Sequence, residues 1–537
     1  MKRRLILGAA LLIPVSACQA GSSSAPGIES IRAASLRADL HFLASDAMRG
    51  RLVGTPEDGL AAEFIKSRFE RLGLRPAGAD GSFFQPFELM SFSLGEENSL
   101  EVLGLPDGPL RLAPGRDFCP LDFSATARGR GSPVYAGFGI VAPPLGHDDF
   151  KGQDLKGKIA LVLQHEPGEN DPKSPFDGLV ASEASAGWRK ALSAQERGAA
   201  GILFVEDVHN HGEGSGGLEA LSSATWPGKP RRIERYHLAL RMERIRIPAA
   251  QVSAGVASKL LAGSGRTLKE LAASAEAAGG VVPVPAAGPQ IDLRVSVLRA
   301  RVAARNVLGL VEGTDPALKA ELVVVCGHYD HEGADGTAIF NGADDNGSGA
   351  VGVIEIAEAF ALAAREGRGP RRSVLFAAWD AEERGLLGAW HYVEHPRWPL
   401  AKTVAAMNMD MVGRNEEILE TGGRFRGLER QTAASNANAV NVIGVERRPE
   451  LRAAIERANR GIGLEIRFRY DNNLSNLLRR SDHWPFLQNG IPAAWFFTGL
   501  HPDYHTPADR PERINYEKME RVLRLVHQVS RDLSDGN

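Results

Sequence analysis

Residues 321–350 read ELVVVCGHYDHEGADGTAIFNGADDNGSGA, and this segment indicates an α/β fold. Glu321 to Gly327 form an apolar run of strand length, which ends in a cluster of His and Asp residues. A Gly-rich turn at 342–349 follows, and 349–364 is an Ala-rich segment that favours a helix. A buried strand, a polar turn and a helix in this order are typical of βαβ architecture.

The same order recurs further along the chain. Residues 372–379, 404–409 and 492–497 are apolar runs of strand length, followed by acidic residues, by Asp410 and, after a loop, by His505. Strands that alternate with helices predict a mostly parallel sheet covered on both faces. Because ligands bind beyond the carboxyl ends of such strands, the polar residues at these ends are the candidate site.

Length and composition restrict the class of protein. The chain has 537 residues, 63 Lys and Arg against 66 Asp and Glu, and a net charge of −3, which suggests two to four domains. The near balance of charge argues against a nucleic-acid-binding surface over the whole chain. Its three cysteines exclude a disulfide framework. No apolar run long enough to span a membrane follows the N-terminal segment.

The N-terminus has the pattern of an export signal. Basic residues 2–4 precede an apolar run at 5–15, and Val15-Ser16-Ala17-Cys18 resembles the bacterial lipobox. We therefore expect a signal peptide over 1–18, a lipidated Cys18 and a tether over 19–28; the alternative is an ordinary cleaved signal. Since Gln19 is not Asp, outer-membrane anchoring facing the periplasm is the expected location in the bacterial envelope, with secretion as the other possibility.

Residues 131–290 differ from the rest of the chain. Runs at 134–140, 158–163 and 201–205 predict strands, and 191–198 predicts a short helix. His209 and His211 flank a Gly-rich stretch, so we expect them to be exposed loop residues. The Ala/Gly/Pro-rich segment 272–289 predicts a linker. Upstream, residues 29–75 have helical periodicity.

Five short segments combine His, Asp and Glu next to strand ends or Gly-rich turns: 328–330, 342–349, 380–385, 408–411 and 504–507. Imidazoles and carboxylates together suit zinc. Two metal ions need about five ligands, one of them bridging, and a further carboxylate can act as general base. The adjacent pair Glu382 and Glu383 suits this division. Asp330 is expected to accept the free N–H of His328, and Cys326 is expected to be a buried core residue.

Taken together, these segments resemble the co-catalytic zinc aminopeptidases, metallopeptidase family twenty-eight, which also includes glutamate carboxypeptidases. Residues 40–46 and the motif 481–483 add to the resemblance, and 137–140 with 154–158 resemble a protease-associated insert domain. The resemblance implies a three-layer α/β zinc-exopeptidase (phosphorylase/hydrolase-like) fold with a mostly parallel central sheet and an inserted β-rich domain. The implied domains are 29–130 and 291–537 for the peptidase and 131–290 for the insert.

The resemblance also implies a role for each matching residue. One zinc ion would be bound by His328 and Asp410, the second by Glu383 and His505, and Asp345 would bridge the two. Glu382 would be the general base and Tyr504 a donor to the oxyanion. A cis peptide is implied between Asp345 and Asn346.

The expected function is therefore hydrolysis of N-terminal residues from peptides with two Zn²⁺ ions. A dipeptidase or carboxypeptidase of the same fold is the alternative, since Arg414, Arg424 and Arg426 are candidates to face a substrate carboxylate. A non-catalytic binding protein is a more remote alternative, because relatives of that kind lack ligands that this chain has. A one-zinc glutaminyl cyclase is disfavoured because His328 is present. The oligomeric state stays open.

Overall fold

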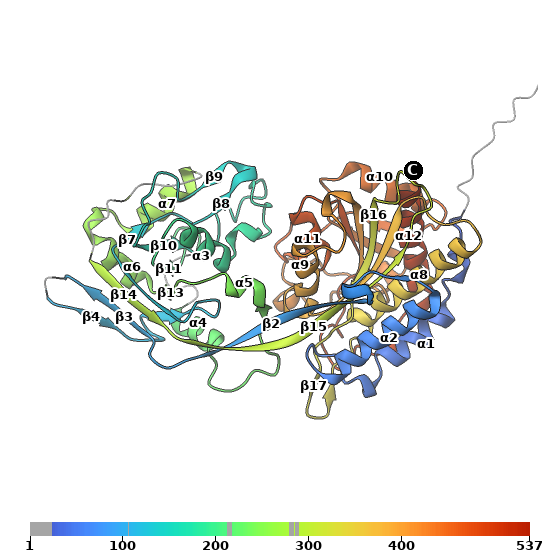
Figure 1. The fold of residues 1–537 in the computed structure, drawn as a ribbon, viewed down its shortest axis with the longest axis horizontal. Helices are drawn as coiled ribbons and strands as arrows, with labels where there is room; N and C mark the ends of the chain where they lie inside the picture. Colours follow the sequence, from blue (N-terminus) through green and yellow to red (C-terminus); the bar gives the residue numbers. More distant parts are fainter. Residues whose placement is uncertain (1–23, 106, 212–216, 279–283, 285–288, 537) are drawn as a thin grey trace, which may run out of the picture.

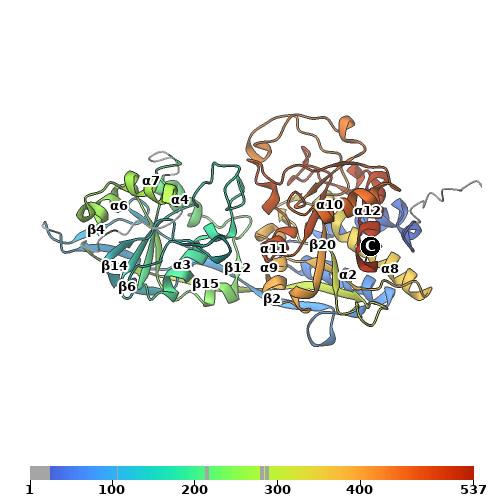
Figure 2. The ribbon, with the colours of Figure 1, turned by 90° about the horizontal axis from the view of Figure 1, so that it is seen from above.

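A computed structural model describes residues 24–105, 107–211, 217–278, 284 and 289–536. The expected signal peptide, Cys18 and the first part of the expected tether lie outside these residues. The last part of that tether is packed against the protein: Ala25 and Ile28 are buried, and the Ala25 N–H donates to the Gln528 side chain at 2.8 Å. The described residues form two lobes side by side (Figure 1, Figure 2).

The first lobe, residues 24–94 and 297–536, is built on a ten-stranded mixed sheet with the order β12-β2-β15-β19-β16-β20-β23-β21-β22, and β1 pairs with β15. The short edge strand β12 is contributed by residues 237–238 of the second lobe. Its central strands β19, β16, β20 and β23 are parallel. The strands are β1 (Arg75–Pro76), β2 (Phe84–Leu94), β12 (His237–Leu238), β15 (Val297–Val311), β16 (Leu322–His328), β19 (Ser373–Trp379), β20 (Thr403–Met409), β21 (Ala439–Ile443), β22 (Glu465–Arg467) and β23 (Ala493–Phe497).

Helices cover both faces of this sheet, so the predicted three-layer α/β fold is confirmed. The helices are α1 (Ala33–Leu43), α2 (Pro56–Leu72), α8 (Gly349–Arg365), α9 (Leu387–Glu394), α10 (Pro449–Asn459), α11 (His483–Gln488) and α12 (Tyr516–Asp535). Successive residues of β16 enter opposite core clusters: Val325 packs with α8 and α12, and Cys326 packs with α9 and α11. A parallel strand buried on both faces is apolar throughout, as β16 is before its final residues.

The segment Ala343–Arg365 has the length and hydropathy of a membrane span among the residues that the structure describes. However, 83% of this apolar stretch is buried inside the protein, because its helix α8 lies in the middle of the core of the first lobe. This core helix starts directly after the Gly-rich turn and therefore fixes the position of Asp345.

The second lobe, residues 95–296, holds two larger sheets, the two-stranded sheet β8-β9 and five α-helices among its described residues. A five-stranded sheet has the order β5-β13-β11-β10-β7, and a four-stranded sheet has the order β4-β3-β14-β6. The elements are β3 (Ser99–Leu103), β4 (Leu110–Leu112), β5 (Phe118–Pro120), β6 (Ala127–Gly131), β7 (Pro133–Tyr135), β8 (Val141–Ala142), β9 (His147–Asp148), β10 (Ile159–Leu163), α3 (Gly187–Glu196), β11 (Gly201–Val205), α4 (Leu218–Thr225), α5 (Ala239–Glu243), β13 (Ala249–Val252), α6 (Ala254–Leu261), α7 (Leu268–Ala278) and β14 (Gln290–Val295).

Two sequence-based expectations differ from this lobe. Strands β3 to β5 pair within its sheets, so the lobe begins well ahead of residue 131. The linker expected at 272–289 is wrong for its first part, because residues up to Ala278 belong to α7. Leu271, Ala272 and Ala275 of this helix are buried at helical spacing against the lobe core.

Two adjacent strands connect the lobes. β2 and β15 run antiparallel over their whole paired length, from Leu94 opposite Val297 to Phe84 opposite Val307. Figure 1 shows both strands passing from one lobe to the other.

Candidate dinuclear metal centre

The first group of side chains lies at the carboxyl ends of β16 and β20. His328 is the last residue of β16, and its Nε2 lies 3.5 Å from Oδ1 of Asp345 and 3.5 Å from Oδ1 of Asp410. Asp410 follows β20, and its Oδ2 accepts a hydrogen bond from the Ser481 hydroxyl at 2.6 Å. The parallel register of the two strands thus brings the imidazole and the carboxylate together.

Asp345 lies between two histidines. Its Oδ1 faces His328, whereas its Oδ2 lies 2.9 Å from Nε2 of His505, so each carboxylate oxygen faces a different imidazole. Asp509 fixes the backbone by accepting the N–H of Asp345 at 3.1 Å. The Asp345–Asn346 peptide is cis, as the family resemblance implies. A carboxylate whose two oxygens face different imidazoles, as those of Asp345 do, suits a ligand that bridges two ions.

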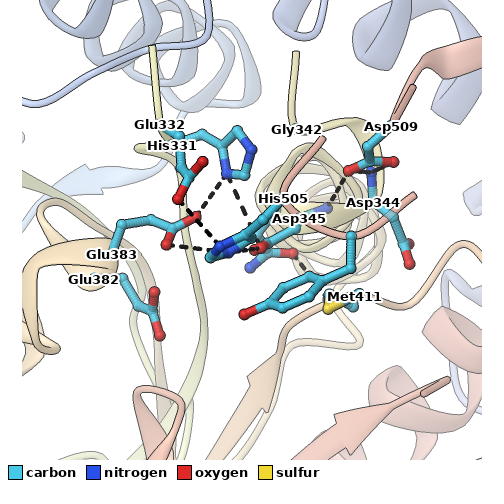
Figure 3. A network of polar contacts seen from close by, with 12 residues as sticks. His331, Glu332, Gly342, Asp344, Asp345, Glu382, Glu383, Met411, His505 and Asp509 are labelled. Carbon is cyan, nitrogen blue, oxygen red and sulfur yellow. Dashed lines mark hydrogen bonds and ion pairs between the residues drawn. The ribbon is translucent and has the colours of Figure 1, made fainter. Parts of the chain in front are cut away.

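Glu383 is held from two sides by imidazoles (Figure 3). Its Oε2 lies 3.3 Å from Nε2 of His505, and its Oε1 lies 2.6 Å from Nδ1 of His331. Glu332 faces the other ring nitrogen of His505, with Oε1 at 3.1 Å from Nδ1. Neither His331 nor Glu332 was predicted as a site residue, although both directly follow the predicted segment 328–330.

Glu382 takes a different position from its neighbour. Its Oε2 lies 3.6 Å from Nε2 of His328, and the side chain lines a small cavity of about 30 Å³ together with Tyr504 and Arg480. The carboxylate of Asp330 accepts the backbone N–H groups of Glu382 at 2.9 Å and Glu383 at 3.3 Å.

The structure revises the expected role of Asp330. Its carbonyl oxygen lies 3.2 Å from Nδ1 of His328, closer than its carboxylate oxygen at 3.6 Å. The backbone of Asp330 therefore orients the imidazole, because the side chain turns toward the amides of the Glu382–Glu383 turn.

These residues fit a pair of metal ions. Four buried donor atoms, Nε2 of His328, Oδ1 of Asp410, Nδ1 of His331 and Oε1 of Glu383, make no hydrogen bond, although each lies within 3.6 Å of another polar atom. Buried polar atoms are otherwise almost always hydrogen-bonded. Three sets of ligand atoms converge among the described residues of the lobe: His328, Glu382 and Asp410; His331, Asp345 and Glu383; Glu332, Glu383 and His505.

Burial and neighbouring charges shift the pKa values of several side chains in the site. Burial opposes the charge of His328, but the carboxylates of Glu382 and Asp410 outweigh it and raise the pKa of this imidazole well above its usual range. Burial favours the neutral form of Asp345, yet its contacts with His328 and His505 hold its pKa below the usual range. Burial raises the pKa of the Glu382 carboxyl well above its usual value, and neighbouring carboxylates add to the effect. A group with such a shift is suited to proton transfer.

Tyr504 and Arg480 form the outer wall of the site. The Arg480 guanidinium donates to the Tyr504 hydroxyl at 3.2 Å. Burial raises the pKa of this phenol, so it keeps its proton at neutral pH. Both residues also line a wider cleft of about 330 Å³, to which the second lobe contributes Glu183.

Other predicted candidates lie elsewhere. Arg414 pairs with Asp503 at 2.9 Å, and Arg424 contacts the Tyr504 carbonyl oxygen. Arg426 is exposed. Cys326 is fully buried in the core, as predicted.

The part of the chain that holds this candidate centre is similar to a known protein family. Residues 306–530 match peptidase family M28. This M28 segment contains His328, Asp345, Glu382, Asp410 and His505. It leaves out the second lobe, so the family match concerns only part of the first lobe.

Individual relatives are named after two different activities, carboxypeptidase and aminopeptidase. The chain is 27% identical over 332 residues to "Probable glutamate carboxypeptidase AMP1" of Arabidopsis thaliana, covering 59% of this chain and 43% of that protein. It is 29% identical over 231 residues to "Aminopeptidase YwaD" of Bacillus subtilis, covering 41% of this chain and 43% of that protein. The chain thus spans less than half the length of these curated relatives.

A solved structure with a similar chain length is an aminopeptidase from Aneurinibacillus sp. strain AM-1. The comparison covers 94% of both chains with 18% identity and a TM-score of 0.47.

Proposed function

We propose that this protein is a zinc-dependent exopeptidase that removes amino-terminal residues from peptides with two metal ions. The observation that carries the proposal is Asp345, whose two carboxylate oxygens face His328 at 3.5 Å and His505 at 2.9 Å. A buried carboxylate placed in this way suits a bridging ligand, and the M28 segment belongs to a family of peptidases.

In this proposal His328 and Asp410 would hold the first ion, Glu383 and His505 would hold the second, and Asp345 would be a ligand of both. Bound zinc ions supply Lewis acidity to a peptide carbonyl and lower the pKa of water. His331 and Glu332 contact Glu383 and His505, so they orient these two ligands.

Proton transfer is assigned to Glu382. Its carboxylate faces the same cavity as Asp345 and Asp410, so it is in reach of a water molecule between the ligands and the substrate. It would take a proton from this water and return the proton to the leaving amine. The Tyr504 hydroxyl, which stays protonated, would donate a hydrogen bond to the developing oxyanion.

A carboxyl-terminal exopeptidase is the second candidate, and Arg480 is the observation that favours it. The guanidinium lines the same small cavity as Glu382, Glu383 and Tyr504. An arginine in this position can bind a free substrate carboxylate through two parallel hydrogen bonds.

One peptide in four forms separates these possibilities. A dipeptide with both ends free, its N-acetylated form, its C-amidated form and the doubly blocked form are incubated with the zinc-loaded protein, residues 19–537. Aminopeptidase action requires cleavage of the amidated form and none of the acetylated form. The opposite pattern indicates a carboxypeptidase, and cleavage of the free form alone indicates a dipeptidase. Absence of cleavage of all four, with zinc bound, contradicts exopeptidase function.

The substitution Arg480→Leu extends this test, with Arg479→Leu as the matched control. Arg479 lies next to Arg480 but pairs with Glu183 of the second lobe. If Arg480 binds a substrate carboxylate, its loss raises KM for substrates with a free carboxyl end only. If the protein is an aminopeptidase, KM for amidated and free substrates changes by the same factor.

We also propose that the protein is anchored in a bacterial envelope through a lipidated Cys18, facing the periplasm, or is secreted. The basic start, apolar run and lipobox-like residues 15–18 support this location. Incorporation of a labelled fatty acid into the full chain and its loss in Cys18→Ala test the anchor. Equal labelling of both chains would contradict it.

A further inference from the structure

The second lobe has an edge of its own where parallel strands end together. β10 and β11 are parallel neighbours, with Leu163 opposite Val205 at their ends. His165 follows the end of β10, Glu169 lies four residues later, and His211 follows the end of β11. Segments that follow neighbouring parallel strands meet at one edge of the sheet, which is where ligands bind in α/β proteins.

These three side chains converge on each other. Glu169 Oε2 lies 3.1 Å from Nδ1 of His165, and Glu169 Oε1 lies 2.5 Å from Nε2 of His211. The two imidazole rings stack with their centroids 4.3 Å apart. One donor atom from each residue lies within 4.8 Å of the other two. His211 is therefore not the plain exposed loop residue that the sequence predicts.

The contact between His211 and Glu169 is close without being a hydrogen bond. Nε2 of His211 and Oε1 of Glu169 are both buried, and neither has a hydrogen-bond partner. The candidate dinuclear centre shows the same feature, since Nδ1 of His331 and Oε1 of Glu383 lie 2.6 Å apart and are also without hydrogen bonds. An N–H···O bond depends on direction, whereas two ligands of one ion approach each other without that alignment.

The backbone around the cluster is fixed by buried groups. Lys190 is buried, and its Nζ donates to the carbonyl oxygens of Leu163 at 3.0 Å and His165 at 2.6 Å. On the other segment, the buried carboxylate of Asp207 accepts the His209 N–H at 3.0 Å. Positions held in this way can present ligands before an ion binds.

We propose that His165, Glu169 and His211 form a divalent metal site in the second lobe, with zinc as the preferred ion. Two imidazoles and one carboxylate are a ligand set that zinc accepts, with water in the remaining position. The exposed fractions of the His165 and His211 side chains are 42% and 35%, so an ion reaches the site from solvent. The site shares no residue with the dinuclear centre and does not depend on peptidase activity.

The ion would lie at the start of a loop that reaches the other lobe. After Glu169 the chain continues to Leu179, whose N–H donates to Asn472 at 2.9 Å, and to Glu183, which pairs with Arg479 at 3.3 Å. Glu183 lines the cleft beside Glu382. A metal at the start of this loop therefore restrains one wall of the cleft.

Metal counting in four versions of the full chain tests the proposal. The versions are wild type, His165→Asn with His211→Asn, His328→Asn with His505→Asn, and the combination of all four substitutions. After equilibration with buffered zinc, mass spectrometry gives the zinc content per chain. We expect the first pair of substitutions to remove about one zinc ion in both backgrounds, whether or not the dinuclear centre is loaded. An unchanged count in both backgrounds overturns the proposal.

Two additions keep this test decisive. His209→Asn is the matched control, because His209 is on the same loop but exposed and outside the cluster; it should lose no zinc. If the double variant is shown by circular dichroism to be unfolded, Co²⁺ is titrated into the His328→Asn/His505→Asn chain with and without Glu169→Gln. A visible ligand-field band that Glu169→Gln abolishes supports the site, and an identical spectrum in both chains refutes it.

Discussion

The carboxylate of Asp330 accepts a hydrogen bond from the backbone N–H of Glu382 at 2.9 Å. Asp330, two residues after the end of β16, thus positions the turn that carries the proposed base Glu382 and the proposed ligand Glu383. Asp330 is fully buried, and its backbone also faces the imidazole of His328. One residue therefore couples the orientation of the proposed first-ion ligand to that of the Glu382–Glu383 turn.

Asp330→Asn should lower kcat on the order of 10- to 100-fold, because the amide presents only one acceptor to two N–H donors. Zinc content at saturating zinc should stay unchanged, since no ligand is replaced. The measurement is kcat and KM together with zinc per chain. Asp335→Asn, at an exposed position of the short hairpin after the site, is the control and should behave as wild type. An unchanged kcat in Asp330→Asn would show that the turn does not need this acceptor.

Glu382→Gln should reduce kcat on the order of 10²- to 10⁴-fold, since the amide cannot carry the proton. Zinc content should be retained. Glu383→Gln is the informative comparison, because it removes a proposed ligand and should lower zinc content as well as activity. Metal analysis and steady-state kinetics on the same samples distinguish the roles of Glu382 and Glu383. Equal zinc loss in both variants would argue against the division of roles.

Ser481→Ala should weaken zinc binding by on the order of tenfold or more. The hydroxyl holds Asp410 at 2.6 Å and accepts from the Asn408 amide at 2.7 Å, so its removal frees a proposed ligand and leaves a buried donor unpaired. Competition with a chromogenic chelator measures the zinc affinity. Ser475→Ala, whose hydroxyl donates to the nearby Asn473 side chain, should leave the affinity unchanged.

Glu355→Gln should alter how stability depends on pH. Glu355 is a buried residue of α8, and burial, followed by the charge of Glu358, raises its pKa from 4.5 to about 8. Between these two values the folded chain holds a proton that the unfolded chain releases. The stabilisation from this group is therefore complete below pH 4.5 and is lost as the pH rises through 8.

The slope from one such group is at most about 1.4 kcal/mol per pH unit. Urea unfolding in chelator at several pH values between the two pKa values measures it. Relative to wild type, Glu355→Gln should gain stability steadily as the pH rises. Glu366→Gln, with an exposed side chain just after α8, is the control. Parallel curves for wild type and Glu355→Gln would contradict the raised pKa.

Much of the fold could be predicted from the apolar strands and from the polar residues that end them. Val323 to Val325 form a run that is apolar on both faces, so a central parallel strand is the natural reading, and the histidine that ends it must lie at the carboxyl edge. The same logic applies to Asp410 after β20. Short-range pattern and the rule for strand ends were therefore enough to bring these residues together.

His331 could not be found in that way. Its N–H donates to the carbonyl oxygen of Arg51, 280 residues earlier by sequence number, and its ring lies where a side chain on Gly342 would otherwise be. The direction of the ring thus depends on two distant segments. The contact of His165 and Glu169 with His211 is of the same kind, because it depends on the pairing of β10 with β11. No local pattern in the sequence reports such contacts.

The path of the chain between the lobes shows how the second lobe is inserted into the first. The second lobe leaves and re-enters the peptidase sheet at Leu94 and Val297, which face each other across paired strands. Joining these two positions by a tight turn would convert β2 and β15 into an ordinary hairpin and leave the order of the central parallel strands intact. The second lobe is thus inserted as an enlarged hairpin loop between β2 and β15, and its Val180 and Leu238 pack into the core of the first lobe.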